Sequence, residues 1–311
     1  SKSQNIKNPE IKIFINQKNI IFEDNCGGFE KEILENNEIK TSHLKEMEIV
    51  TLGEDVNKTK RLKESAIERT LECLKKYKAK CDELGVKEII AKATSATRDS
   101  ENRYEFIERV FKETGIKIEC ISGKEEGTYT FKGATLDIKD ELVLLDIGGG
   151  STEVIYGNSE EIKYIKSFDI GAVRIREKYF ESDDFTSNYD KAKKWVLDEI
   201  SELSFLREKK FTLVAVAGTA TTQVSVKEKM KIYDSKIVHK YKLTKSDIVS
   251  NIELYKSFNL EERKNIVGLH PKRADVIIGG TYILDIIMDF LGKDTLLISE
   301  NDILEGIMVE A

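Results

Sequence analysis

The stretch that decides the fold is Asp-Ile-Gly-Gly-Gly-Ser-Thr-Glu at residues 146–153. It follows a wholly apolar run, 142–147, and leads into a second segment with strand character. Consecutive glycines let backbone N–H groups approach a phosphate with no side chain in the way. Asp146 is placed to hold a hydrated Mg²⁺, and Glu153 supplies a second carboxylate close by. The alternative interpretation is a tight glycine-rich hairpin turn.

A second glycine turn is Gly-Thr-Ala-Thr-Thr at residues 218–222, after a predicted buried strand over 211–217. A helix is expected to begin here, and a helix N-terminus with unpaired N–H groups binds phosphate readily. The alternative is that Thr219 only caps the helix. Two such turns, each after a buried strand, favour a phosphate site. The predicted phosphate-binding residues of the two turns are Gly148, Gly149, Gly150, Ser151, Gly218, Thr219 and Thr221.

Paired glutamates mark a third segment, Ser-Gly-Lys-Glu-Glu-Gly at 122–127. Ser122 with Glu125 matches the capping box of a helix start, which leaves Glu126 unexplained. Glu126 is therefore a candidate general base, provided that it faces the ligand. Its alternative role is to complement the helix dipole.

Arginines at three places allow the same two interpretations. Arg98 follows a predicted strand in Ala-Thr-Ser-Ala-Thr-Arg, 93–98, and its guanidinium can bind phosphate oxygens in a bidentate way. It can equally be a surface arginine on an ordinary loop. Arg174 and Arg273 carry the same ambiguity.

The hydrophobic pattern predicts the order of the other elements. A hairpin is expected over 11–22, and no assignment is made for 26–48. The predicted strands and helices then follow at 65–84 (helix), 86–93 (strand), 102–114 (helix), 116–121 (strand), 142–147, 152–156 and 162–168 (strands), 189–206 (helix), 211–217 (strand), 244–291 (mainly helix), 296–299 (strand) and 302–309 (helix). The order β-β-β-α-β-α begins near residue 142. A degenerate copy of the same order begins near residue 11. A duplicated unit of this kind is typical of the actin-like architecture.

Composition limits the function further. A chain of 311 residues suits two α/β domains, and a formal net charge of −6 argues against a nucleic-acid binder. The 4 cysteines form no Cys-x-x-Cys pair and the 3 histidines are far apart, which disfavours zinc and a serine triad. No apolar run is long enough for a membrane span, and residues 1–10 lack a signal peptide's apolar core. We therefore expect a cytoplasmic protein with free thiols and no membrane partner.

Seven motifs in the same order resemble the Ppx/GppA family of exopolyphosphatases and guanosine pentaphosphate phosphohydrolases. The resemblance covers about residues 52–306, and its motifs lie at 93–98, 122–126, 146–153, 171–174, 218–222, 273–280 and 299–306. It implies an α/β fold of two ribonuclease H-like domains of the actin/hexokinase type, with the ligand in the cleft between them. We expect one domain from residues 1–127 with 297–311, and the other from 128–296.

The resemblance also implies residue roles and partners. The family's catalytic glutamate falls on Glu126, its metal-binding aspartate on Asp146, and a further active-site carboxylate on Glu153. The expected cofactor is Mg²⁺ or another divalent cation, and the expected substrate is polyphosphate or a (p)ppGpp-type nucleotide. Family members are often dimers, which leaves a homodimer open.

One departure from the family concerns its first phosphate loop, Asp-Ile-Gly-Ser-Asn-Ser. The corresponding place here, 14–19, reads Phe-Ile-Asn-Gln-Lys-Asn, with neither glycine nor aspartate. The main hypothesis is a hydrolase that removes terminal phosphate by metal-assisted attack of water. The alternatives are a non-catalytic polyphosphate or alarmone binder, favoured by this departure, and an actin-like kinase or ATPase.

Overall fold

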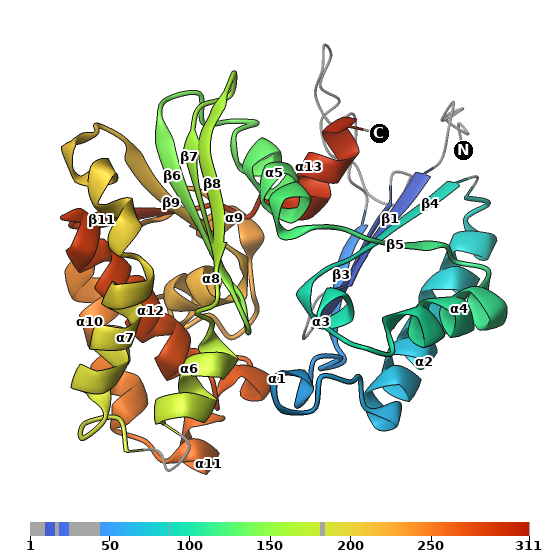
Figure 1. Ribbon diagram of the computed structural model, residues 1–311, viewed down its shortest axis with the longest axis horizontal. Coiled ribbons are helices and arrows are strands. Elements are labelled where there is room, and N and C mark those ends of the chain that lie inside the picture. The colour runs from blue at the N-terminus through green and yellow to red at the C-terminus, as the bar shows by residue number, and fades with distance from the viewer. Residues whose placement is uncertain (1–9, 16–18, 25–43, 87, 181–183, 311) are drawn as a thin grey trace. The chain divides into compact units, whose positions relative to one another are not determined.

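The computed structural model describes residues 10–15, 19–24, 44–86, 88–180 and 184–310 (Figure 1). The chain divides into two compact units, one formed by residues 1–129 with 304–311 and the other by 130–303. Asn16 and its neighbours up to Lys18, the expected remnant of the first phosphate loop, lie outside the described residues. Among the described helices, none combines the length and the apolar character that a membrane crossing requires.

The first unit is built on a five-stranded sheet of order β3-β2-β1-β4-β5. Strands β1, β2 and β3 form an antiparallel meander, and β4 and β5 continue it in parallel with β1. The predicted hairpin near residue 11 is confirmed. Strand β3 overlaps residues 26–48, for which the sequence pattern predicts no element. The strands are β1 (Glu10–Ile15), β2 (Asn19–Asp24), β3 (Leu44–Ile49), β4 (Glu88–Ala93) and β5 (Ile118–Cys120).

Helices α2 and α4 contribute about half of the described apolar core of this unit. Residues such as Ile67, Leu71 and Leu74 recur at three- and four-residue spacing, so one face of α2 is buried. The closing helix α13 clusters with this unit, and Gly306 lies so close to Tyr129 of α5 that a Cβ would be 1.7 Å from its carbonyl oxygen. The helices are α1 (Val56–Thr59), α2 (Glu64–Glu83), α3 (Ser95–Arg98), α4 (Arg103–Thr114), α5 (Gly123–Ala134) and α13 (Ile303–Glu310).

The second unit is built on a six-stranded sheet of order β10-β11-β9-β6-β7-β8. Strands β6, β7 and β8 are an antiparallel meander, and β9 and β11 run parallel to β6. Apart from the edge strand β10, this repeats the order and direction of the first sheet, so the predicted duplication is confirmed. The strands are β6 (Leu142–Ile147), β7 (Thr152–Gly157), β8 (Ile162–Phe168), β9 (Thr212–Val216), β10 (Lys242–Thr244) and β11 (Thr295–Ile298).

Helix α12 is the centre of the large core on one face of this sheet, and nearly all of its residues are buried. The second face carries a smaller core that includes Leu144, Ile155 and Phe131 of α5. The helical elements are α6 (Ala172–Tyr179), α7 (Tyr189–Glu199), the 3₁₀ segment Ser201–Glu208, α8 (Ala217–Lys227), α9 (Ser235–Val238), α10 (Lys245–Lys256), α11 (Leu260–Arg263), the 3₁₀ turn Pro271–Arg273 and α12 (Ile277–Leu291).

Three details differ from the sequence expectations. Strand β11 pairs with β9, so residues 297 and 298 belong with the second unit and only the helix after them clusters with the first. The helix expected over 189–206 changes at residue 200 into a 3₁₀ segment. Helix α6, at 172–179, was not predicted.

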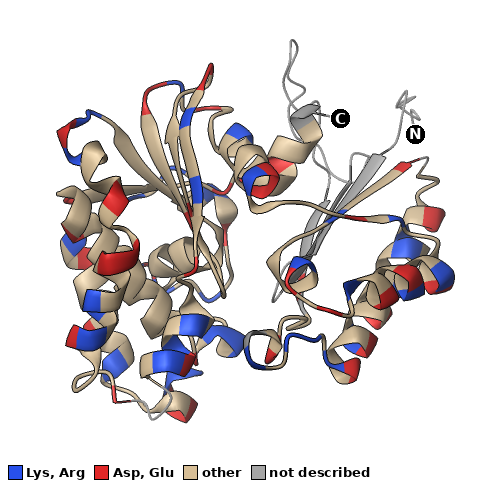
Figure 2. Cartoon of the chain, viewed as in Figure 1, with Lys and Arg blue, Asp and Glu red and all other residues tan. Residues whose placement is uncertain are grey.

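Charged side chains of both signs are interspersed along the described helices of each unit (Figure 2). Many of them pair, as Arg109 does with Glu64, Glu68 and Glu113 in the first unit. Exposed pairs of this kind are each worth less than about 1 kcal/mol. The phosphate recognition that the sequence predicts would therefore depend on local groups.

Candidate active site

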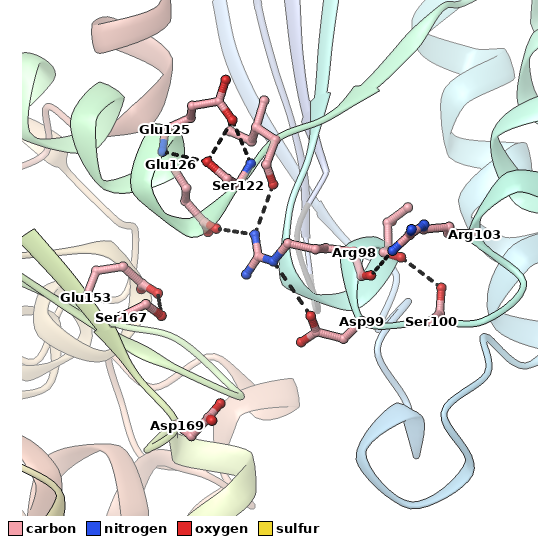
Figure 3. Close-up of polar contacts among 12 residues, drawn as sticks. Arg98, Asp99, Ser100, Arg103, Ser122, Glu125, Glu126, Glu153, Ser167 and Asp169 are labelled. Atoms are coloured by element: carbon pink, nitrogen blue, oxygen red, sulfur yellow. Dashed lines mark hydrogen bonds and ion pairs between the residues drawn. The ribbon is translucent and has the colours of Figure 1, made fainter.

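Two carboxylates of the glycine-rich segment face the same side of the second unit's sheet. Asp146 on β6 and Glu153 on β7 are direct cross-strand partners, so their side chains emerge next to each other. Glu153 is buried, and the hydroxyl of Ser167 on β8 donates to its Oε1 at 2.6 Å (Figure 3). The antiparallel register thus brings together the two residues that the sequence analysis assigned to a metal.

These carboxylates fit a Mg²⁺ ion. Like charges directly opposite each other on two strands are destabilising, and a divalent cation would neutralise them. Mg²⁺ needs only one or two carboxylates because it keeps several waters. Among the described residues there is no cluster of three or more histidine, cysteine, aspartate or glutamate side chains that would form an all-protein cage. The two carboxylates match the number that a hydrated Mg²⁺ ion takes.

The glycine turn after β6 is held from behind by the start of α6. The backbone N–H of Ala172 donates to the carbonyl oxygen of Gly148 at 2.9 Å, and that of Val173 donates to Gly149 at 2.8 Å. The first turn of a helix has N–H groups with no partner inside the helix, and here the glycine carbonyls satisfy them. The carbonyl side of the turn therefore points toward α6.

The third carbonyl of the turn, that of Gly150, accepts a hydrogen bond from Nε of Arg174 at 2.9 Å. Every peptide bond in the described structure is trans, so each carbonyl points opposite to the N–H that follows it. The N–H groups of residues 149–151 are consequently directed away from α6. Three adjacent N–H groups with one direction form a nest suited to an anion.

The second glycine turn begins at the neighbouring strand end. β9 is parallel to β6, and Asp146 pairs with Val216, so the two turns leave the same edge of the sheet. The chain turns sharply at Ala217, whose φ is +62°, and α8 begins there. The hydroxyl of Thr219 donates to the carbonyl of Ile147 at 3.0 Å, which links the second turn to the start of the first.

Arg273 lies against the second turn. Its Nη1 donates to Oγ1 of Thr222 at 2.9 Å and to the carbonyl of Gly218 at 3.3 Å. A Cβ on Gly218 would be 2.5 Å from Nη2 of Arg273, so a larger residue would require the guanidinium to shift. Burial lowers the pKa of Arg273. The structure thus gives Arg273 a contact with the turn that the sequence left ambiguous.

A buried polar network supports α8 from behind. The amide nitrogen of Gln223 donates to the carbonyl of Thr219 at 3.0 Å and to Thr281 at 2.9 Å. Its oxygen accepts from Asn251 at 3.0 Å and from Tyr255 at 3.3 Å. Gln223 has no exposed surface, so its side-chain amide is paired with these four groups and not with water. The sequence carried no signal for this network, since glutamine is unremarkable in a helix.

Replacing Gln223 by leucine is expected to destabilise the second unit by about 3 kcal/mol. The substitution keeps the volume and removes four buried hydrogen bonds of the Gln223 side chain, each worth roughly 0.5–1.5 kcal/mol. The measurement is urea unfolding followed by circular dichroism. Ser250→Ala is the control, because it removes an exposed bond of Ser250 to the carbonyl of Ser246 and should cost less than about 0.5 kcal/mol. Equal effects of the two variants would contradict the role of the network.

In the first unit, Glu126 and Arg98 face each other. Nη1 of Arg98 lies 3.3 Å from Oε2 of Glu126 and donates to the carbonyl of Ile121 at 3.0 Å (Figure 3). Its Nε lies 3.6 Å from Oδ1 of Asp99. Glu126 is 8% exposed, so its carboxylate is held in one place. In this structure Arg98 orients the candidate base.

Glu125 has the separate role that the sequence predicted. Its Oε2 accepts from the backbone N–H of Ser122 at 2.8 Å and from its hydroxyl at 2.7 Å, while its own N–H donates to Oγ of Ser122 (Figure 3). This is the predicted capping box. The hydrogen bonds from Ser122 lower the pKa of Glu125. The two adjacent glutamates therefore differ in environment, one at the exposed cap and one buried.

Both units contain a sheet of the same topology, and the second sheet carries two glycine turns and a pair of carboxylates at one edge. These features define a phosphate-handling protein of the actin-like ATPase fold. The model of the Ppx/GppA phosphatase family matches residues 35–311. The chain belongs to this phosphatase family, which confirms the predicted resemblance.

Relatives and solved structures agree with this assignment. The chain is 32% identical over 278 residues to Exopolyphosphatase 2 of Mycobacterium tuberculosis. This match covers 85% of this chain and 87% of that protein. It is 50% identical over 287 residues to the bifunctional 3-dehydroquinate synthase/phosphatase of Fusobacterium nucleatum subsp. nucleatum. That match covers 89% of this chain but only 43% of the Fusobacterium protein. The structure of the Aquifex aeolicus PPX-GPPA enzyme has a TM-score of 0.82 at 29% identity, over 98% of this chain and 99% of that one.

Proposed function

We propose that this chain removes the terminal phosphate from inorganic polyphosphate, from guanosine pentaphosphate, or from both, with Mg²⁺ or another divalent cation as cofactor. The observation that carries the proposal is the orientation of the first glycine turn. Its three carbonyls are bound on one side, so its N–H groups are presented together on the other. A terminal phosphate offers the oxygens that such a nest binds.

The two units divide the chemistry. In the second unit, the N–H groups of residues 149–151 and the start of α8 bind phosphate oxygens. Asp146 and Glu153 would hold the divalent cation, which supplies charge neutralisation for the phosphoanhydride when bound. In the first unit, Glu126 orients a water molecule and accepts its proton as water attacks the terminal phosphorus. The bond to the bridging oxygen then breaks, and orthophosphate leaves.

Removing the metal is expected to abolish phosphate release. Without a cation, the opposed carboxylates of Asp146 and Glu153 would repel a polyanion. The assay measures orthophosphate released from long-chain polyphosphate and from guanosine pentaphosphate, with Mg²⁺ and with excess chelator. Asp146→Asn should raise the Mg²⁺ concentration needed for half-maximal rate, whereas Asp169→Asn, on an exposed carboxylate of the same unit, should leave it unchanged. Undiminished release in chelator would contradict the metal requirement.

The second candidate function is a non-catalytic sensor of polyphosphate or a guanosine alarmone. It is favoured by the sequence at 14–19, which has no glycine and no aspartate where the family has its first phosphate loop. Binding of polyphosphate without release, in a folded sample containing Mg²⁺, would support this function. As part of the main proposal we place the reaction in the cytoplasm, as the cysteine pattern of the sequence predicts.

A further inference from the structure

Arg174 contacts the back of the first glycine turn and not its N–H side. Its Nε donates to the carbonyl oxygen of Gly150 at 2.9 Å, and its Nη2 lies 3.2 Å from Oδ1 of Asp169. Its side chain is 30% exposed and Asp169 is 84% exposed, so the ion pair is solvated. The bond to Gly150 is the contact that bears on the turn.

The three carbonyls of the turn are held in two different ways. Those of Gly148 and Gly149 accept from backbone N–H groups of residues 172–174, which any side-chain substitution leaves in place. The carbonyl of Gly150 is held by a side chain. Because the peptide bond to Ser151 is trans, the direction of the Ser151 N–H follows from that of the Gly150 carbonyl. One of the three donors therefore depends on Arg174.

We propose that Arg174 is a positioning residue for phosphate binding, which holds the Gly150 carbonyl so that the N–H of Ser151 is directed at the bound phosphate. This inference rests on the proposed function of the turn as a phosphate site. It assigns to Arg174 a role through a hydrogen bond and not through its charge. Glycine at 150 has no side chain to restrict its own peptide plane, which is why an external contact is needed.

Three substitutions separate the hydrogen bond from the charge. The amide nitrogen of glutamine stands at the same place along the side chain as Nε of arginine, so Arg174→Gln keeps the donor and removes the charge. Arg174→Lys keeps the charge but has carbon at that place. Arg174→Met has neither. Lys178→Met is the control, because Lys178 lies on the same helix, where its Nζ is 4.3 Å from the centroid of the Trp195 ring.

The first readout is the KM for polyphosphate at saturating Mg²⁺. Loss of one well-aligned donor is expected to raise KM about tenfold in Arg174→Met and Arg174→Lys, with a smaller change in kcat. Arg174→Gln and Lys178→Met should stay within about threefold of the wild type. A wild-type KM in Arg174→Lys together with a raised KM in Arg174→Gln would overturn the inference. That result would show that Arg174 acts on the phosphate through its charge.

The second readout does not require turnover. In the ¹⁵N-labelled full chain, tripolyphosphate should shift the amide resonance of Ser151 in the wild type and in Arg174→Gln, but much less in Arg174→Met. The same spectra verify that each variant is folded. If Arg174→Met is not folded, the comparison of Arg174→Gln with Arg174→Lys tests the inference. Wild-type protein that shows this shift but releases no phosphate would reject the hydrolase and leave the inference standing. Equal Ser151 shifts in all variants would overturn it.

Discussion

Replacing Glu126 by glutamine is expected to lower kcat for phosphate release by about 10²–10⁴-fold, the range that a positioned general base contributes. Glutamine has nearly the same size, and its oxygen can still accept from Nη1 of Arg98, which lies 3.3 Å from Oε2 of Glu126. The buried site therefore keeps its packing. What is lost is the ability to take a proton from water. Affinity for polyphosphate should stay within about threefold of the wild type, since the two glycine turns that we propose to bind phosphate are in the second unit.

The neighbouring Glu125 offers a matched control for this experiment. Glu125→Gln makes the same chemical change one residue away, in the capping box with Ser122. It should lower stability by about 1 kcal/mol or less and leave kcat unchanged. Single-turnover release of orthophosphate and equilibrium binding of polyphosphate measure the two quantities separately. If Glu126→Gln hydrolysed polyphosphate at the wild-type rate, or if both variants lost activity equally, Glu126 would not be the base.

The fold was largely predictable because its strands are short apolar runs that end at polar motifs. The run 142–147 and the strand 212–216 both lead into glycine turns, and parallel pairing places those turns at one edge of the sheet. The meander before each parallel strand pair repeats in the two units, and this periodicity is visible in the sequence. Strand β3, with polar residues between Leu44 and Ile49, lacks such a run and was missed.

Contacts between distant residues were not predictable in the same way. Ser65 and Glu68 have the three-residue spacing of a capping box in the sequence. In the structure, however, α2 begins at Glu64, and Glu68 pairs with Arg109. The polar network of Gln223 depends on partners up to 58 positions away. A local pattern therefore located the candidate residues, whereas the groups that hold them in place came only from the tertiary structure.

Replacing Gly171 by alanine is expected to lower kcat/KM for polyphosphate by about 100-fold, because a displacement of roughly 1 Å in a positioning element costs about that much. A Cβ at this residue would lie 2.4 Å from the carbonyl oxygen of Gly149 and 2.6 Å from the carbonyl carbon of Gly150. These atoms are backbone, so the turn or the start of α6 has to move. Gly171 has an extended conformation, with φ of −155°, which alanine adopts without strain. The whole effect is therefore steric.

The stability change separates this explanation from a general loss of folding. Overpacking of this kind costs about 1–3 kcal/mol, whereas Gly148→Ala, whose Cβ would meet only the carbonyl of Ser151 at 3.3 Å, should cost less than about 1 kcal/mol. Thermal unfolding and kcat/KM are measured on both variants. A folded Gly171→Ala with wild-type kcat/KM would show that phosphate binding tolerates a displaced turn. The carbonyls of Gly149 and Gly150, which a Cβ at Gly171 would displace, fix the direction of the N–H groups that follow them. Such a result would therefore show that the N–H groups of residues 149–151 do not set the rate.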